Sequence, residues 1–253
     1  MRNLTALLFF GLLSLRAAAS DGSLSLSPSV VMLRGDYGQS ATHVLTLTNA
    51  TSRPFEFELV AQDVVTRDGK RAFVEAGSVA GSIAATALFS EQQVRVAPGE
   101  SVRVQVTVTI PPATSQRAIV ALFRGTNRIM SGNVPILASL GTLLTFSVTN
   151  DLQLTTAPLD IHAQTPTSNL SVSQLCTNSG HEPFVAQGVM AVLDEQGALV
   201  GKTLLRPHRL IPGESAILEA EHTGELDPGR YRVFVTYAFE GQTLSKSAEV
   251  VVR

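Results

Sequence analysis

Hydrophobic and polar residues alternate along most of the chain with a period of two. The run Val102–Ile110 alternates without interruption, so one face is apolar and the other polar, as in a half-buried antiparallel strand. Similar alternation recurs in the runs 55–61, 231–237 and 248–252. No long segment shows the 3.6-residue period of a helix, and only 82–89 suits one or two helical turns. The chain is therefore predicted to be all-β, a sandwich or barrel of short strands.

The pattern repeats once along the chain. Asn49 and Asn178 are each followed, after four residues, by Pro-Phe, and a Pro-Gly-Glu-Ser turn then occurs at Pro98 and again at Pro212. Proline and glycine favour tight turns, and asparagine tolerates the left-handed backbone at the end of a strand. An acidic-Gly turn, Asp68-Gly69 in the first half and Glu195–Gly197 in the second, lies between them, and four marks in the same order indicate two related domains.

The predicted domains are 21–150 and 151–253, with the boundary near 150–158. Each has about the size of an immunoglobulin-like sandwich. The Pro-Gly-Glu-Ser turn comes 49 positions after the asparagine in the first domain and 34 in the second. The first domain therefore carries an extra segment near 71–92, whose role the sequence leaves open.

Residues 1–20 are predicted to be a secretory signal peptide. Arg2 precedes the apolar run Leu4–Leu15, and small residues suited to cleavage follow at Ala17–Ser20. The apolar run is shorter than the roughly 20 residues of a membrane-spanning helix, which argues against a signal anchor. We expect a protein located outside the cytoplasm, with no membrane insertion after cleavage. The single cysteine, Cys176, lies in an apolar segment and is predicted to be a buried, inert thiol.

Composition and motifs exclude several function classes. The net charge of −2 gives no electrostatic footprint for nucleic acid. The histidines lack metal-ligand spacing, and neither a Gly-x-Ser-x-Gly nor a phosphate-binding motif occurs. We therefore predict a protein that is not an enzyme, with no catalytic residues, metal or cofactor. His181-Glu182, an alternative acid–base pair, is interpreted as a solvated loop pair, and the basic cluster Arg67–Arg71 as a solvated hairpin tip, with a ligand-binding patch as its alternative.

The order of the marks in the first half resembles one known family. A strand opens near Ser27–Val31 and another covers His43–Asn49, followed by the Pro-Phe strand, an Asp-Gly turn, the Pro-Gly-Glu-Ser turn and a stop at Ile110–Pro112. This order resembles the amino-terminal domain of PapD-like periplasmic pilus-assembly chaperones. The resemblance implies two immunoglobulin-like (PapD-like) β-sandwich domains in tandem, a periplasmic location and a pilin-like protein subunit as partner.

The resemblance also implies a partner-binding strand at the end of the first domain. In the family, that strand adds to an incomplete subunit, so that backbone hydrogen bonds supply affinity and alternate side chains fill pockets. Four apolar residues alternate at the matching position: Val134, Ile136, Ala138 and Leu140. A strand that faces its own core has the same pattern, so the sequence leaves donor and core strand as alternatives.

The family further carries two basic residues in the cleft between its domains, which anchor the terminal carboxylate of the subunit. Arg34 lies near the first of these positions but one residue out of register, and a slip of one residue turns a strand side chain to the opposite face. Residues 133–148 contain no Lys or Arg for the second position. Arg34 is thus a possible basic anchor, and the full pair is either absent or rebuilt from other residues.

Two functions remain in competition. The first is an assembly chaperone that binds a protein subunit by strand addition. The alternative is a structural or accessory immunoglobulin-like module of the cell surface or periplasm without chaperone activity. A chaperone should expose the edge near 133–146, whereas a structural module should cover it.

Overall fold

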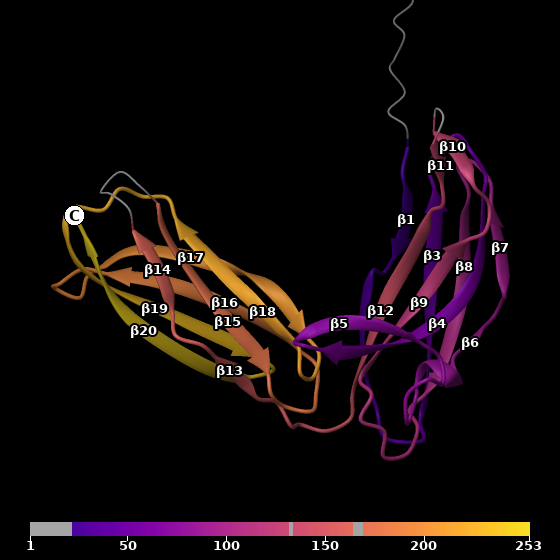
Figure 1. Cartoon of the computed structure of the whole chain (residues 1–253), viewed down its shortest axis with the longest axis horizontal. Coiled ribbons are helices and arrows are strands. Elements are labelled where there is room, and N and C mark those ends of the chain that lie inside the picture. The colour runs from indigo at the N-terminus through magenta and orange to yellow at the C-terminus, as the bar shows by residue number, and fades with distance from the viewer. Residues whose placement is uncertain (1–21, 132–133, 164–168) are drawn as a thin grey trace, which may run out of the picture.

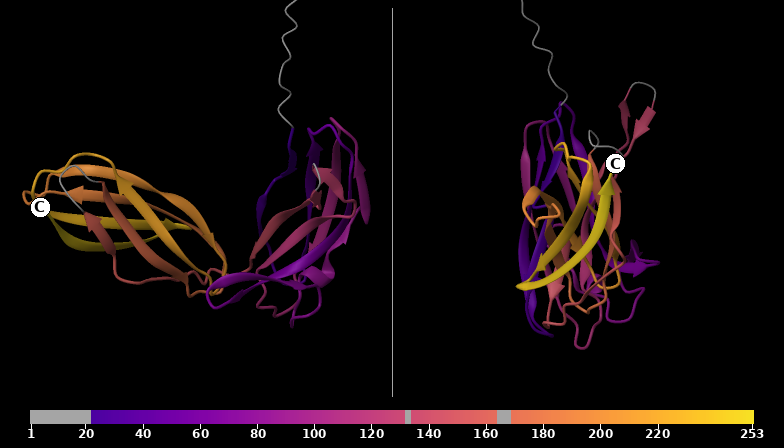
Figure 2. Two further views of the ribbon diagram at one scale, coloured as in Figure 1. Left: turned by 45° about the horizontal axis from the view of Figure 1, so that its top comes forward. Right: turned by 90° about the vertical axis from the view of Figure 1, so that its left-hand side faces the viewer.

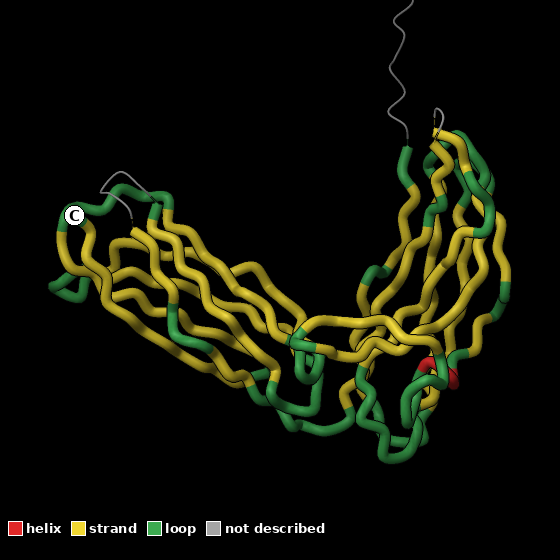
Figure 3. Tube along the Cα trace, in the orientation of Figure 1, coloured by secondary structure: helices red, strands yellow, loops and turns green. Residues whose placement is uncertain are grey.

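The computed structural model describes residues 22–131, 134–163 and 169–253, which form two β-sandwiches set at an angle (Figure 1). The predicted signal peptide, residues 1–20, lies outside the described residues. Nearly all regular structure is strand, and one 3₁₀ turn, η1 (Ala84–Thr86), falls inside the segment 82–89 (Figure 3). The prediction of an all-β fold with two immunoglobulin-like sandwiches is confirmed. Within the described part of the chain, no helix is long and apolar enough to cross a membrane.

The first sandwich consists of two sheets. One sheet has the order β1 (Leu24–Ser27), β3 (Ser40–Asn49), β8 (Ser101–Thr109) and β6 (Leu88–Phe89). The other has the order β2 (Val30–Arg34), β12 (Ser139–Ser147), β9 (Ala118–Gly125), β4 (Phe55–Arg67) and β5 (Lys70–Glu75), with β7 (Gln93–Val96) also paired to β4. A small hairpin, β10 (Ile129–Ser131) and β11 (Val134–Ile136), extends from β9 and β12.

The second sandwich has the same two-layer plan. One sheet joins β13 (Leu154–Thr156) and β14 (Asp160–Ala163) to β15 (Leu170–Asn178), which also pairs with β18 (Ser215–His222). The other has the order β17 (Leu199–Leu210), β16 (Phe184–Leu193), β19 (Gly229–Phe239) and β20 (Gln242–Val252). The left-hand view of Figure 2 shows the two sandwiches meeting at one end of each.

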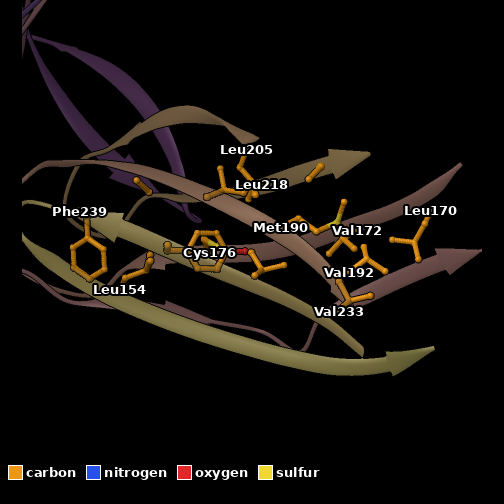
Figure 4. Packing of buried hydrophobic residues seen from close by; sticks show 14 of the residues in the cluster. Leu154, Leu170, Val172, Cys176, Met190, Val192, Leu205, Leu218, Val233 and Phe239 are labelled. Atoms are coloured by element: carbon orange, nitrogen blue, oxygen red, sulfur yellow. The ribbon is translucent and has the colours of Figure 1, made fainter. Parts of the chain in front are cut away.

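Alternating side chains fill a separate core in each sandwich. In β8, Val104, Val106 and Val108 are fully buried, whereas Arg103 and Gln105 are exposed. This is the arrangement that the period-two pattern predicts. In the second core, Cys176 lies among Met190, Phe239 and other apolar side chains (Figure 4). Burial raises the pKa of its thiol, and the predicted burial of this cysteine is confirmed, while its inertness stays a prediction.

The repeated asparagine makes the same hydrogen bonds in both sandwiches. Asn49 Nδ2 donates to the carbonyl oxygens of Arg53 (2.7 Å) and Val96 (3.1 Å). Asn178 Nδ2 donates to the carbonyl oxygens of Glu182 (2.8 Å) and Leu210 (3.1 Å). Each asparagine thus ties a loop of its own sandwich to the neighbouring strand. Its side chain supplies the donor that the carbonyl groups of the loop and the strand need.

The repeated Pro-Gly-Glu-Ser turn closes onto that asparagine in both sandwiches. Gly99 N donates to Asn49 O, and Gly213 N donates to Asn178 O, each at 2.8 Å. The glutamate of each turn accepts a backbone hydrogen bond three residues back, at Ala97 for Glu100 and at Ile211 for Glu214. The sequence repeat is therefore a structural repeat.

The extra segment of the first sandwich covers a sheet edge. Its strand β6 pairs with the outer side of β8, Leu88 opposite Thr107 and Phe89 opposite Val106. Upstream of β6, the buried Asp63 carboxylate accepts hydrogen bonds from the backbone N–H groups of Ile83 and Ala84, both at 3.0 Å. Covering an edge in this way removes a row of unpaired backbone groups that would otherwise pair with other chains.

Candidate functional site: the cleft between the sandwiches

Strand β12 forms part of the cleft wall, and its first half has an open edge. It pairs with β9 from Ser139 to Thr145, but with β2 only from Leu143 to Ser147. Thr142 Oγ1 donates to Pro28 O (2.8 Å), which marks the point where β2 approaches. Among the described residues, no strand pairs with 139–142 on the side away from β9. Backbone groups on that side are free to pair with another chain.

An apolar strip lies beside this open edge. Phe73, Val120, Leu122 and Leu143 line a cavity of about 330 Å³, together with Gly141 and Arg71. Phe73 is 58% exposed, which is unusual for a large aromatic side chain without a partner. We call these four apolar side chains the cleft strip. They lie on the outer face of the sheet, because Ile119 and Phe123 of the same strand β9 face the core.

The residues expected to form one partner-binding strand are divided between two strands. Val134 and Ile136 belong to β11, Ala138 lies in the connection, and Leu140 belongs to β12. Ile136 is 47% exposed, whereas Leu140 packs against the core of the first sandwich. The strand is therefore interrupted between 136 and 139, and the four residues do not share one continuous strand.

Basic side chains gather at the end of the cleft strip. Lys70 and Arg71 from β5, and His208 and Arg209 from β17, line a second cavity of about 440 Å³ that also touches Leu143. Arg71 Nη2 donates to Arg209 O (2.6 Å), and Arg209 Nη1 donates to Thr145 Oγ1 of β12 (3.1 Å). Burial, and then the neighbouring positive charge of Arg71, lower the pKa of Arg209, while Glu240 raises it. Arg71 thus bonds the backbone of β17 while the Arg209 side chain bonds β12, and both arginines line the same cavity.

Two resident carboxylates face these arginines. Glu214 Oε1 lies 2.8 Å from Arg71 Nε, and the side chain of Glu214 is nearly buried. Glu240 Oε2 accepts a hydrogen bond from Arg34 Nη2 (3.4 Å). Arg34, the possible basic anchor, thus lies at the same end of the cleft as Glu240, but its side chain is 68% exposed. The carboxylates offset part of the positive charge. None of the ion pairs between described residues includes Lys70.

The hairpin β4–β5 carries part of this site and also joins the sandwiches. Ser215 N donates to Gly69 O (2.8 Å), and Thr66 Oγ1 donates to Pro212 O (2.8 Å). Gly69 has φ +73, and a Cβ there would come 3.0 Å from Ser215 Oγ, so glycine suits this close approach. The interpretation of Arg67–Arg71 as a solvated tip is therefore wrong for Gly69 and Arg71, which contact the second sandwich, whereas Lys70 is exposed (Figure 1).

A buried ion pair also joins the two sandwiches. Arg117 Nε donates to Glu182 Oε1 (3.0 Å), and the two side chains are 5% and 0% exposed. Glu182 also accepts hydrogen bonds from the backbone N–H groups of Val148 and Thr149, both at 3.0 Å. Arg117 stacks on Tyr37, with its guanidinium carbon 5.9 Å from the ring centre.

The interpretation of His181-Glu182 as a solvated pair is therefore wrong for Glu182. His181 is exposed and bonds Asp151, whereas its neighbour is buried between the two sandwiches. Sequence reasoning missed Arg117 altogether. The signal was weak, because 65 positions separate the two partners and nothing local marks either as buried.

Comparisons with known proteins give similar folds but no relative by sequence. No protein-family profile matches the chain, and no curated protein matches it either. The class 5 fimbriae chaperone CfaA is 12% identical with a TM-score of 0.47, covering 89% of this chain and 98% of its own. The E. coli chaperone DraB is 16% identical with a TM-score of 0.40, covering 90% and 98%. A structure of the CsuC–CsuE chaperone–tip adhesion subunit complex of Acinetobacter baumannii is 7% identical with a TM-score of 0.46, covering 92% of this chain and 100% of its own.

Many of the solved structures that resemble this chain are thus PapD-like fimbrial chaperones. The identities and the TM-scores are both low. What the cleft binds therefore has to follow from the side chains of this chain.

Proposed function

We propose that this chain is a non-enzymatic periplasmic chaperone that binds an extended segment of a pilin-like subunit along the open edge of β12. One observation carries the proposal: the open edge, the cleft strip and the arginines Arg71 and Arg209 lie side by side in a single cleft. Strand addition uses backbone hydrogen bonds for affinity and pockets for alternate side chains. The open edge supplies the first, and the cleft strip supplies the second.

The basic end of the cleft suits the terminal carboxylate of the bound segment. Arg71 and Arg209 come from β5 and β17, so the anchor is rebuilt from strands other than the two that the family resemblance implies. Arg209 uses one of the five N–H donors of its guanidinium group for Thr145, so donors remain for a bound carboxylate. A carboxylate between the two arginines would relieve their mutual repulsion and gain charge-assisted hydrogen bonds.

Residues beyond the open edge would lengthen the contact. Ile136 and Leu137, 47% and 53% exposed, directly precede β12 in the chain. A partner strand that continues past Ser139 would meet them and cover apolar surface that is otherwise in water. A periplasmic location follows from the predicted signal peptide and brings the chain together with secreted subunits.

Site-specific photo-crosslinking in the native envelope tests the proposal. A photoreactive phenylalanine analogue replaces Ile136 or Leu122 in the mature chain, and the control carries it at Val44, an exposed position on the opposite sheet. We expect one small β-rich subunit to crosslink from the two cleft positions and not from Val44.

Two results would count against the proposal. Equal labelling from all three positions would mean nonspecific contact, and no labelling of a secreted subunit would favour the structural or accessory module. Leu140 favours that second function, because its side chain packs against the core of its own sandwich. Circular dichroism of each variant checks that the fold is intact.

A further inference from the structure

The two cavities of the cleft share a wall. We call the cavity lined by the cleft strip the apolar cavity, and the one lined by Lys70 and Arg209 the basic cavity. Leu143 and Arg71 line both of them. The polar end of Arg71 is held on the basic side, because its Nη2 bonds Arg209 O (2.6 Å) and its Nε lies 2.8 Å from Glu214 Oε1. An apolar and a basic surface therefore adjoin at these two side chains.

The apolar cavity has room for one large side chain. Its volume is about 330 Å³, and its lining includes Phe73 from β5, Val120 and Leu122 from β9, and Gly141 from β12. A Cβ at Gly141 would lie 2.6 Å from Val120 Cγ2, so this position stays without a side chain and leaves the cavity open toward β12. Phe73 is 58% exposed, and a ligand in the cavity would cover apolar surface that is now in water.

A strand bound along the open edge of β12 has to end at these cavities. β2 pairs with β12 from Leu143 onward, and Leu143 N donates to Ser29 O (3.0 Å). In the described part of the chain, a partner therefore finds free backbone groups on this edge only up to Thr142. Gly141 on one side of that point lines the apolar cavity, and Leu143 on the other lines both cavities. The last residue of a bound strand thus lies where the two cavities meet.

We propose that the last residue of the partner strand carries a large apolar side chain, which fills the apolar cavity while its terminal carboxylate enters the basic cavity. This inference rests on the proposed function, because it places the same segment in the same cleft. The carboxylate and the side chain of a terminal residue leave the same Cα atom, which suits two cavities that share a wall. Neighbouring side chains of a strand point to opposite faces, so the penultimate residue does not fill the apolar cavity instead.

Peptide binding tests this assignment. Three peptides share one alternating valine–asparagine sequence with a fluorophore at the amino end, and finish in Ala-Phe, in Phe-Ala or in amidated Ala-Phe. The first two have the same composition. Fluorescence anisotropy gives their affinities for the mature wild-type chain, for Phe73→Ala and for Leu88→Ala. Leu88→Ala is the matched control, because it also truncates a large exposed side chain (69% exposed) but lies on the other sheet.

We expect wild type to bind the Ala-Phe peptide about five- to tenfold more tightly than the Phe-Ala peptide, the range that partial burial of one phenylalanine supports. Phe73→Ala should lower that ratio to about twofold or less, and Leu88→Ala should leave it unchanged. Leu122→Ala, which truncates the lining of the same cavity from β9, should also lower the ratio. Phe73→Ala should still prefer the free carboxylate over the amide, because the basic cavity is intact.

The outcomes separate this inference from the proposed function. If wild type prefers the free carboxylate but binds the two peptides of equal composition equally, the inference is overturned and the proposed function stands. A full ratio in both Phe73→Ala and Leu122→Ala, with the fold intact by circular dichroism, overturns it as well. If wild type does not distinguish the Ala-Phe peptide from its amide, the carboxylate anchor is wrong and the inference falls with it.

Discussion

The two sandwiches use the same motifs, but only the second one places them at the junction. In the first sandwich, the Pro-Gly-Glu-Ser turn ends in solvent and Glu100 is exposed. In the second, the same turn docks on the β4–β5 hairpin, and the equivalent Glu214 is buried beside Arg71. The backbone geometry is common to both, so what differs is the surface that covers it. A repeated turn has thus become a joint through the side chains that meet it.

The asparagine loops differ in the same way. Asn49 bonds the carbonyl of Arg53, and Asn178 bonds the carbonyl of Glu182. Arg53 and Glu182 therefore occupy equivalent positions in the two loops. Arg53 is exposed, while Glu182 is buried and accepts from Arg117, Val148 and Thr149. The loop with Arg53 follows the end of a strand in its own sandwich, whereas the loop with Glu182 also joins the two sandwiches.

The largest expected effect comes from removing the buried carboxylate at the junction. Glu182→Ala leaves Arg117 buried without its counter-charge, and should lower the free energy of unfolding by about 3–5 kcal/mol. Arg53→Ala, at the equivalent exposed position, should cost markedly less than Glu182→Ala, because truncating an exposed side chain leaves no buried charge unpaired. Urea unfolding followed by circular dichroism measures both. Similar costs for the two variants would contradict the contrast drawn between the two loops.

The repeated asparagines should instead give equal effects. Asn49→Ala and Asn178→Ala each remove two hydrogen bonds to carbonyl oxygens of a loop and a neighbouring strand, and each should cost about 2–3 kcal/mol. Their positions relative to the junction do not matter, because both sets of bonds lie within one sandwich. The same urea titration provides the comparison. A loss of stability at only one of the two sites would show that the two asparagines share the same hydrogen bonds but not the same contribution to the free energy of unfolding.

Local patterns predicted the fold better than the site. Alternation identified β8 and the core valines, and the Asn and Pro-Gly-Glu-Ser marks identified the structural repeat, because each depends on residues close together in sequence. The junction depends on partners far apart, such as Arg117 with Glu182 and Arg71 with Arg209. A charged residue in a loop has the same local pattern whether water or another sandwich covers it.

The open edge shows the same limit. An unbroken period of two predicted one strand through 134–140, but the chain leaves that strand at 137–138 and starts again at Ser139. Period two assigns side chains to faces, and it says nothing about where pairing with a neighbour begins or ends. The approach of β2 at Leu143 sets the open edge, and that contact is between strands more than a hundred residues apart.

A smaller effect is expected from the two glutamates of the repeated turn. Glu214→Gln keeps an acceptor for Ile211 N but loses the charge facing Arg71, and should cost about 1 kcal/mol. Glu100→Gln keeps the bond from Ala97 N in an exposed turn, so its effect should be near zero. Urea midpoints of the two variants are compared with wild type. Equal midpoints would mean that the Arg71 contact adds nothing to the joint.

The smallest effect should come from the second ion pair that spans the sandwiches. Arg34→Gln removes the partner of Glu240, and because the guanidinium is mostly in water, unfolding should change by less than about 0.5 kcal/mol. Comparison with Glu182→Ala distinguishes an ion pair that stabilises the junction from one that spans it without stabilising it. The difference should shrink further at high salt, because mobile ions screen an exposed ion pair. A loss comparable to that of Glu182→Ala would mean that the Glu240 turn helps to hold the sandwiches together.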